Sequence, residues 1–199
     1  RRGDPLDNLQ DAETLVKKIS RLHNTATSNV LIGKLATEEK FKLLAPKYRI
    51  IILAAHGLFG DLDPMRSSIV LAQTGRKTRD DGFLEAREIA TMKLSAEMAV
   101  LSACDTGRGQ IRDGEGIVGL PWAIFVAGCP TTVVSQWKVD SVGTADLMTL
   151  MYSHLYRNNR QATKAEALQK AAISMLNSTN KDFHHPFYWA GFILFGKAN

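Results

Sequence analysis

Short apolar runs alternate with amphipathic stretches along the whole chain. Residues 8–23 carry apolar side chains at helical spacing, and residues 48–55, 98–103 and 131–135 are mostly aliphatic or β-branched. A short, uninterrupted apolar run is typical of a strand buried on both faces, and such strands alternate with helices when a sheet is parallel. The pattern therefore predicts an α/β fold with a mostly parallel central sheet flanked by helices.

The same signals predict the remaining elements. A helix begins after Thr37 and ends at Pro46, and two more helices span 141–157 and 164–177. The last of these is opened by a capping box that starts at Thr163. We also expect short strands at 30–32, 68–72 and 191–195, a short helix near 85–91, and a buried helix that spans 114–128.

Length and composition predict one domain that spans residues 1–199. Hydrophobic residues make up 45% of the chain and charged residues 23%, which is ordinary for a globular domain able to bury a core. No apolar stretch has the length of a membrane span and no signal peptide is present, so we expect no membrane association. Because the chain begins Arg1-Arg2-Gly3 without a methionine, we expect it to be a segment of a longer protein.

Charge and cysteine usage narrow the function classes. The net charge is +5, but the basic run 76–79 is followed at once by Asp80 and Asp81. No concentrated basic face with aromatic residues is evident, so direct nucleic-acid binding is not expected. With only two cysteines, a disulfide framework is improbable and a reducing compartment such as the cytoplasm fits better.

Two predicted strands lead into residues capable of thiol chemistry. The run 48–55 is followed by His56 and Gly57, and the run 98–103 by Cys104. Ligands of open α/β sheets bind at the carboxyl ends of the strands, and a histidine beside a cysteine can promote its attack on a carbonyl. Caspases place their histidine about 50 residues before the cysteine, close to the separation here. The sequence therefore indicates a cysteine peptidase with a His56/Cys104 pair.

Each of these residues also has a purely structural interpretation. A free cysteine such as Cys104 is more often an inert, buried side chain, and a histidine after a strand is often an ordinary loop residue. Gly57 favours the functional interpretation, because a glycine lets the backbone approach a ligand closely. The N–H groups of Gly57 and Cys104 would then hold a developing oxyanion. The glycine-rich stretch 107–116 lacks both common phosphate-binding motifs and is interpreted as a loop beside the site.

Six sequence blocks in a fixed order resemble the CHAT domain, a caspase-like peptidase module related in fold to caspases and separases and often found after tetratricopeptide repeats. The blocks are Ala54 to Gly57, Asp81 to Leu84 with Glu88-Ile89, Leu101 to Gly107, Asp113 to Gly116, Ser135 to Asp140, and His185 to Ala190. The resemblance covers nearly the whole chain. It implies a three-layer α/β sandwich with the strand that precedes the first helix missing or reduced to residues 1–5.

The resemblance also implies how the site works. The His56/Cys104 dyad would cleave a protein or peptide substrate without a metal or an organic cofactor. The loop 136–141 would wall the substrate groove, which gives the substrate-binding candidates Asp105, Trp137, Asp140 and Ser141. The family often has a second acid where this chain has Ser141. Asp140 has an alternative role as the N-cap of the next helix, for which aspartate is well suited.

Three further expectations complete the sequence-based hypothesis. Cys129 lies in an apolar segment where burial disfavours the thiolate, so Cys104 should be the more reactive thiol. The glycine-rich and charged stretches 57–67 and 105–116 have little apolar surface to hold them, which predicts a domain that is latent until upstream repeats or an activating partner order them. The alternative is a catalytically silent CHAT module that relays signals from such repeats.

Overall fold

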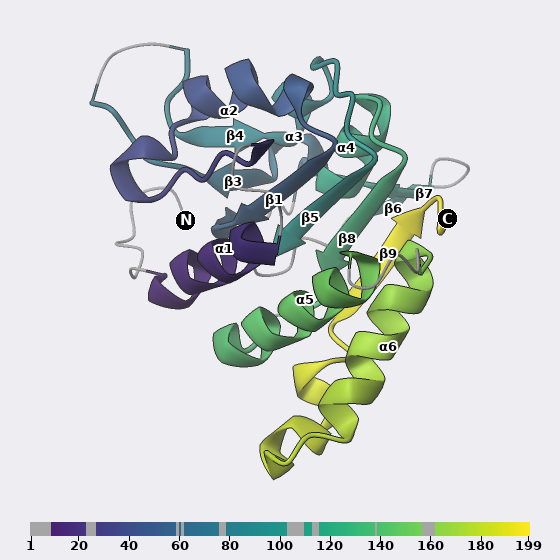
Figure 1. The fold of residues 1–199 in the computed structure, drawn as a ribbon. Helices are drawn as coiled ribbons and strands as arrows, with labels where there is room; N and C mark the ends of the chain where they lie inside the picture. The colour runs from purple at the N-terminus through teal and green to yellow at the C-terminus, as the bar shows by residue number, and fades with distance from the viewer. Residues whose placement is uncertain are drawn as a thin grey trace. The chain divides into compact units, whose positions relative to one another are not determined.

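The computed structural model describes residues 9–22, 27–58, 60, 62–75, 79–102, 110–112, 116–137, 139–156 and 162–199, with backbone alone for 110–112 and 116–118 (Figure 1). The chain divides into two compact units. The first comprises residues 1–7, 31–138 and 193–197, and the second residues 8–30, 139–192 and 198–199. Each unit is described by itself, and the single domain expected from length stays a prediction.

The first unit is built on a four-stranded sheet in the order β1-β5-β8-β9. Its strands are β1 (Ile50–Ala54), β5 (Met98–Ser102), β8 (Thr131–Ser135) and β9 (Phe192–Gly196). β5 is parallel to both β1 and β8. All five residues of β8 and the first four of β5 are buried, as expected for strands in the middle of a sheet that is covered on both faces. The mixed α/β class with a mostly parallel central sheet is confirmed.

Helices α2 (Glu38–Leu44), α3 (Ala86–Ile89) and α4 (Leu120–Val126) pack on one face of this sheet (Figure 1). Their apolar side chains form one core with alternate residues of the strands. This core includes Phe41, Ile51, Leu53, Ile89, Ala99, Leu101, Ile124 and Val134. As the sequence predicts, α2 starts after Thr37, whose hydroxyl accepts a hydrogen bond from the Lys40 amide at 3.3 Å.

A second, antiparallel sheet joins β2 (His56–Leu58), β3 (Ser68–Val70) and β4 (Phe83–Glu85). The sequence analysis placed β3 and α3 within an otherwise irregular stretch and missed β2 and β4. A short 3-10 helix (Pro64–Arg66) connects β2 to β3. A two-stranded hairpin pairs β6 (Gln110–Arg112) with β7 (Gly116–Val118), so part of the stretch 107–116 that was expected to be a loop is strand, because the two segments pair with each other.

The second unit contains α1 (Gln10–Leu22), α5 (Ser141–Tyr156) and α6 (Lys164–Leu176), followed by two 3-10 turns (Lys181–His184 and Pro186–Tyr188). The Lys18 ammonium group reaches the Asp146 carboxylate at 3.2 Å, which links α1 to α5. Helix α6 opens with the predicted capping box between Thr163 and Glu166. All three helices were expected from the sequence.

Two sequence-based expectations are wrong. Residues 30–32 form no strand but lead into a 3-10 turn (Gly33–Leu35), because three apolar residues bounded by Asn29 and Gly33 cannot establish a strand without a partner. Helix α4 begins only at Leu120, after β7, rather than near residue 114. Gly119 takes a φ of 150°, which only glycine adopts easily, and so separates the strand from the helix. Phe125 and Val126 on α4 are exposed rather than buried.

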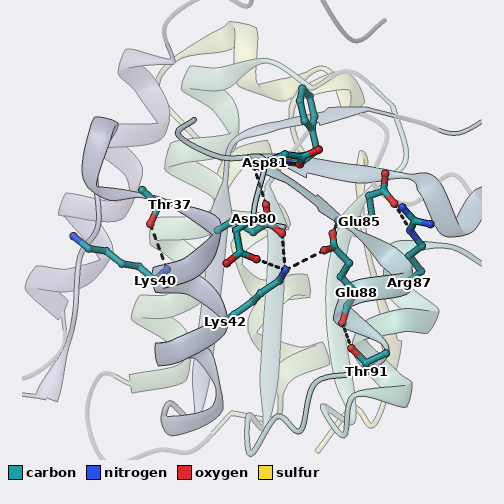
Figure 2. Close-up of polar contacts among 12 residues, drawn as sticks. Thr37, Lys40, Lys42, Asp80, Asp81, Glu85, Arg87, Glu88 and Thr91 are labelled. Atoms are coloured by element: carbon teal, nitrogen blue, oxygen red, sulfur yellow. Dashed lines mark hydrogen bonds and ion pairs between the residues drawn. The ribbon is translucent and has the colours of Figure 1, made fainter. Parts of the chain in front are cut away.

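A cluster of charged side chains links α2 to the segment 80–88 in the first unit (Figure 2). The Lys42 ammonium group lies 2.6 Å from Glu38, 2.7 Å from Asp80 and 3.0 Å from Glu88. Glu38 has only 1% of its side chain exposed. Burial raises the pKa of Glu38, against the opposing effect of its hydrogen bonds with Lys42 and the Gly82 N–H. Burial lowers the pKa of Lys42, but hydrogen bonds to Asp80, Glu38 and Glu88 outweigh it and hold that pKa above its ordinary value.

Replacing Lys42 with Met should destabilise the first unit, because the buried Glu38 carboxylate would lose its counter-ion. Removing one partner of a buried pair costs about 3–5 kcal/mol, and we expect the lower end because Lys42 is partly exposed. The stabilisation by Lys42 should be complete below the ordinary lysine pKa of about 10.4 and decline at higher pH, since only the folded state raises that pKa.

The matched control is Lys40→Met on the same helix, since the Lys40 side chain points away from the cluster (Figure 2). It should change the free energy of unfolding by no more than about 0.5 kcal/mol. Urea denaturation near pH 7 measures both variants. Equal losses in the two variants would contradict the ion-cluster account.

Asp140 acts as the N-cap of α5, because its Oδ2 atom accepts a hydrogen bond from the Gly143 N–H at 2.6 Å. Asp140→Ala should therefore cost about 1 kcal/mol of stability, whereas Asp140→Asn retains an acceptor oxygen and should cost much less. Thermal or urea unfolding of the two variants measures the difference. Stability that is equally reduced, or unchanged, in both variants would argue against the cap.

Candidate active site

The register between β1 and β5 relates the two candidate catalytic residues. Ala54 lies opposite Ser102 at the carboxyl ends of the two strands. His56 lies two residues after Ala54, and Cys104 lies two residues after Ser102. The sequence separation between His56 and Cys104 is therefore the same as that between the paired residues Ile50 and Met98. Cys104 belongs to residues 103–109, which lie outside the described residues. Asp105, a substrate-binding candidate, lies in the same segment.

The structure describes His56 as the first residue of β2 rather than as part of a loop. It pairs with Val70 of β3, and Gly57 pairs with the fully buried Ile69. The His56 side chain is half-buried. Strand pairing on β3 therefore holds the backbone of His56 and Gly57, while the imidazole retains the partial exposure that proton exchange requires.

The connection from β2 to β3 is held by local hydrogen bonds. The Gly60 N–H donates to the Ser67 hydroxyl at 3.1 Å, and the Asp63 carboxylate accepts from the Met65 N–H at 3.0 Å. A Cβ atom at Gly60 would approach the Asp63 carbonyl oxygen to 2.3 Å, so only glycine fits this turn. We expected few contacts to hold the stretch 57–67, but its described residues are held by these hydrogen bonds and by the tight turn at Gly60.

The predicted substrate loop 136–141 crosses the boundary between the two units. Trp137, two residues after the end of β8, belongs to the first unit, and Asp140 and Ser141 belong to the second. The indole N–H of Trp137 is buried and has no hydrogen-bond acceptor among the described residues. Asp140 caps α5, and the hydroxyl of Ser141 donates to the Asp11 carboxylate.

The second cysteine has the inert environment that the sequence predicts. Cys129 is fully buried, and its thiol donates to the Thr131 carbonyl oxygen at 3.3 Å. A buried thiol in an apolar core is a poor nucleophile, because the charged thiolate would lose its hydration.

Other kinds of site receive no support from the described parts of the chain. These parts contain no group of three or more His, Cys, Asp or Glu residues placed to hold a metal ion. His184 instead contacts the Ser178 carbonyl oxygen at 2.8 Å, and the His185 ring accepts from the Phe187 N–H at 3.1 Å. A hollow of about 460 Å³, lined by Lys181, Asp182, His185, Phe187 and Tyr188, contains none of the predicted site residues. None of the described helices has the length and apolarity to cross a bilayer.

The sequence analysis missed the charged cluster around Lys42. One signal was present, since Glu38 and Lys42 are four residues apart on a helix and can pair across one turn. The other members, Asp80 and Glu88, lie 38 and 46 residues after Lys42, so no helical spacing relates them to it. The block Asp81 to Leu84 with Glu88 was noted only as part of the family resemblance.

Comparison with known proteins identifies the family. The family model described as the CHAT domain matches residues 5–197. Mouse tetratricopeptide repeat protein 28 is 31% identical over 114 residues, and its human counterpart is 28% identical over 114 residues. These alignments cover 57% of this chain and only 4% of each relative. The chain therefore corresponds to a small part of those proteins.

Solved structures with the same fold have little sequence identity to the chain. Separase in its complex with securin from Saccharomyces cerevisiae matches with a TM-score of 0.66 and 12% identity, over 95% of this chain and 11% of that one. The Arg-specific cysteine proteinase gingipain R matches with a TM-score of 0.58 and 11% identity, over 97% of this chain and 42% of that one. Such low identities establish the fold alone. The family match over residues 5–197 and this shared caspase-like α/β fold together show that the chain belongs to the CHAT domain family.

Proposed function

We propose that this chain is a cysteine endopeptidase domain with His56 and Cys104 as its catalytic dyad. The parallel pairing of β1 with β5 supports the proposal most directly, because the two candidate catalytic residues have the same sequence separation as the residues that pair between these strands. The family match over residues 5–197 supports the same reaction class. No metal or organic cofactor is needed for this chemistry.

In the proposed reaction, the His56 imidazole takes the proton of the Cys104 thiol. The thiolate attacks the scissile carbonyl carbon, and the amide N–H groups of Gly57 and Cys104 stabilise the oxyanion. Protonated His56 then gives its proton to the leaving amine as the C–N bond breaks. Water hydrolyses the resulting thioester, which releases the second product and restores the thiol.

Substrate recognition is proposed for Asp105, Trp137, Asp140 and Ser141. Trp137 offers a flat apolar surface against which a substrate side chain can pack. Asp140 already uses one carboxylate oxygen to cap α5, which leaves the other oxygen for a cationic substrate side chain. The cap role therefore limits the contribution of Asp140 to specificity without removing it.

The second candidate function is a catalytically silent module that relays signals from upstream repeats. The names of the relatives are consistent with this candidate, since both are tetratricopeptide repeat proteins and the chain covers a small part of each. The separase structure is a complex with securin, so a neighbour of the same fold binds a protein partner. Regulation by repeats or by a partner in the cytoplasm is compatible with either candidate.

The peptidase proposal predicts turnover of a fluorogenic peptide library by the full parent protein. Cys104→Ala should abolish this turnover, and His56→Ala should lower kcat/KM by about 10²-fold or more, the usual contribution of a general acid or base. Cys129→Ser, at the inert cysteine, provides the control and should retain turnover in whatever fraction of the protein folds. Undiminished cleavage by a folded Cys104→Ala variant would contradict the proposal.

The latency of the domain is measured with the same substrates. Residues 1–199 alone should turn over substrate more slowly than the parent protein with its activating partner, because an ordering contact would be missing. Equal rates for the isolated segment, the parent and the partner-bound parent would exclude latency. No turnover in any of the three, with the chain folded, would favour the silent module.

A further inference from the structure

The antiparallel sheet that contains His56 is too small to fix its own geometry. Each of β2, β3 and β4 contributes three residues. Short strands of this kind are only marginally stable, and a slip of one residue would turn every side chain to the opposite face. The position of His56 therefore depends on whatever holds this sheet from outside.

His56 lies at the end of the sheet where hydrogen bonds reach α2. His56 pairs with Val70, and Val70 pairs with Phe83 on its other side. Just beyond this row, the Leu71 N–H donates to the Gly82 carbonyl oxygen at 2.7 Å. The Gly82 N–H in turn donates to the Glu38 Oε2 atom at 2.8 Å. Two consecutive hydrogen bonds thus connect α2 to Leu71, the residue that follows Val70, the strand partner of His56.

Gly82 is suited to this role by its backbone. Its φ of +90° lies in the region that side-chain-bearing residues avoid. A Cβ atom there would lie 2.8 Å from the Gln73 Cγ atom and 3.1 Å from the Leu71 carbonyl oxygen. Glycine therefore lets the segment turn its N–H toward Glu38 while its carbonyl oxygen accepts from Leu71.

Glu38 is costly to bury, which points to a specific role. A carboxylate with 1% exposure is tolerated only when it is paired and hydrogen-bonded. One oxygen pairs with Lys42 at 2.6 Å, and the other accepts from the backbone of Gly82. Lys42 also binds Asp80 and Glu88 on the segment that carries β4 (Figure 2). The two oxygens of Glu38 thus divide between an ion pair and a backbone anchor.

We propose that Glu38 is a positioning residue that sets the backbone of His56 through Gly82 and the β3–β4 pairing. Glu38 touches no reacting atom, and its ion pair with Lys42 supplies stability while its bond to Gly82 supplies the geometry. The importance of this geometry for catalysis rests on the proposed peptidase function. The link between Glu38 and His56 is a structural claim that can be measured without any substrate.

The test separates the Gly82 hydrogen bond from the ion pair with two variants. Glu38→Met removes both interactions, whereas Lys42→Met removes the ion pair and leaves Glu38 able to accept from Gly82. Two-dimensional NMR of the folded protein measures the ring cross-peak of His56, assigned with His56→Gln, and the hydrogen-exchange rate of the Leu71 amide. Glu38→Met should move the His56 cross-peak and speed Leu71 exchange about 10-fold more than Lys42→Met does.

Two further variants keep the proposal testable if Glu38→Met does not fold. Glu38→Gln keeps an oxygen that can accept from Gly82, so it should restore the wild-type His56 cross-peak without restoring full stability. Gly82→Ala leaves Glu38 intact but strains the backbone at its anchor, and should move the His56 cross-peak. A His56 cross-peak and Leu71 exchange rate that follow overall stability alone across these variants would overturn the proposal.

Peptide turnover by the same variants distinguishes this proposal from the peptidase proposal. If both are correct, Glu38→Met lowers kcat more than Lys42→Met at saturating substrate, and Glu38→Gln recovers it. A His56 cross-peak that depends on Glu38 in a protein without turnover would uphold the positioning role and reject the peptidase. Turnover with a His56 cross-peak that does not depend on Glu38 would support the peptidase proposal and reject the positioning role.

Discussion

The parallel, in-register pairing of β1 with β5 is the constraint on which the candidate site depends. Met98, Ala99, Val100 and Leu101 of β5 are all buried, so both faces of this strand are covered. A shift by one residue would exchange the two faces of β1, and Ile51 and Leu53 would leave the core. Burial therefore fixes the register, and the register fixes which residues emerge together at the carboxyl ends of the two strands.

The second sheet and the charged cluster extend this constraint to His56. After β1 ends at Ala54, the chain enters β2 at once, and β3 holds it there. The cluster around Lys42 connects that sheet to α2, which packs on the same core as β1 and β5. A buried carboxylate contributes little net stability compared with an apolar side chain of similar size. The burial of the Glu38 carboxylate is better explained by the geometry that its hydrogen bond imposes on Gly82.

The sequence predicted elements whose signals are local. The central strands were identified from short runs of aliphatic or β-branched residues such as 98–102, and α6 from its capping box at Thr163. Strands β2 and β4 were missed because three residues carry no periodicity and gain their structure from partners distant in sequence. The strand predicted at 30–32 does not form for the same reason, since apolar composition alone does not supply a partner strand.

The candidate site was predicted from the sequence to a similar extent. His56 was expected just after the strand at 48–55 and lies two residues after β1, but its pairing with Val70 could not be inferred from local sequence. The N-cap role of Asp140 was recognised as an alternative because an aspartate before a helix is a local signal. Glu38 was missed as a site-supporting residue because its hydrogen bond to Gly82 joins α2 to a residue 44 positions further along the sequence. Roles that depend on tertiary contacts are the part that the sequence did not reveal.

The most direct test of the catalytic dyad is mass-mapped alkylation of the folded protein near neutral pH. The account predicts that Cys104 is labelled at least about 10-fold faster than the buried Cys129, because a neighbouring imidazole favours the thiolate. His56→Ala should remove most of this preference without changing the labelling of Cys129. Equal labelling of the two cysteines, or preferred labelling of Cys104 that does not depend on His56, would contradict the dyad.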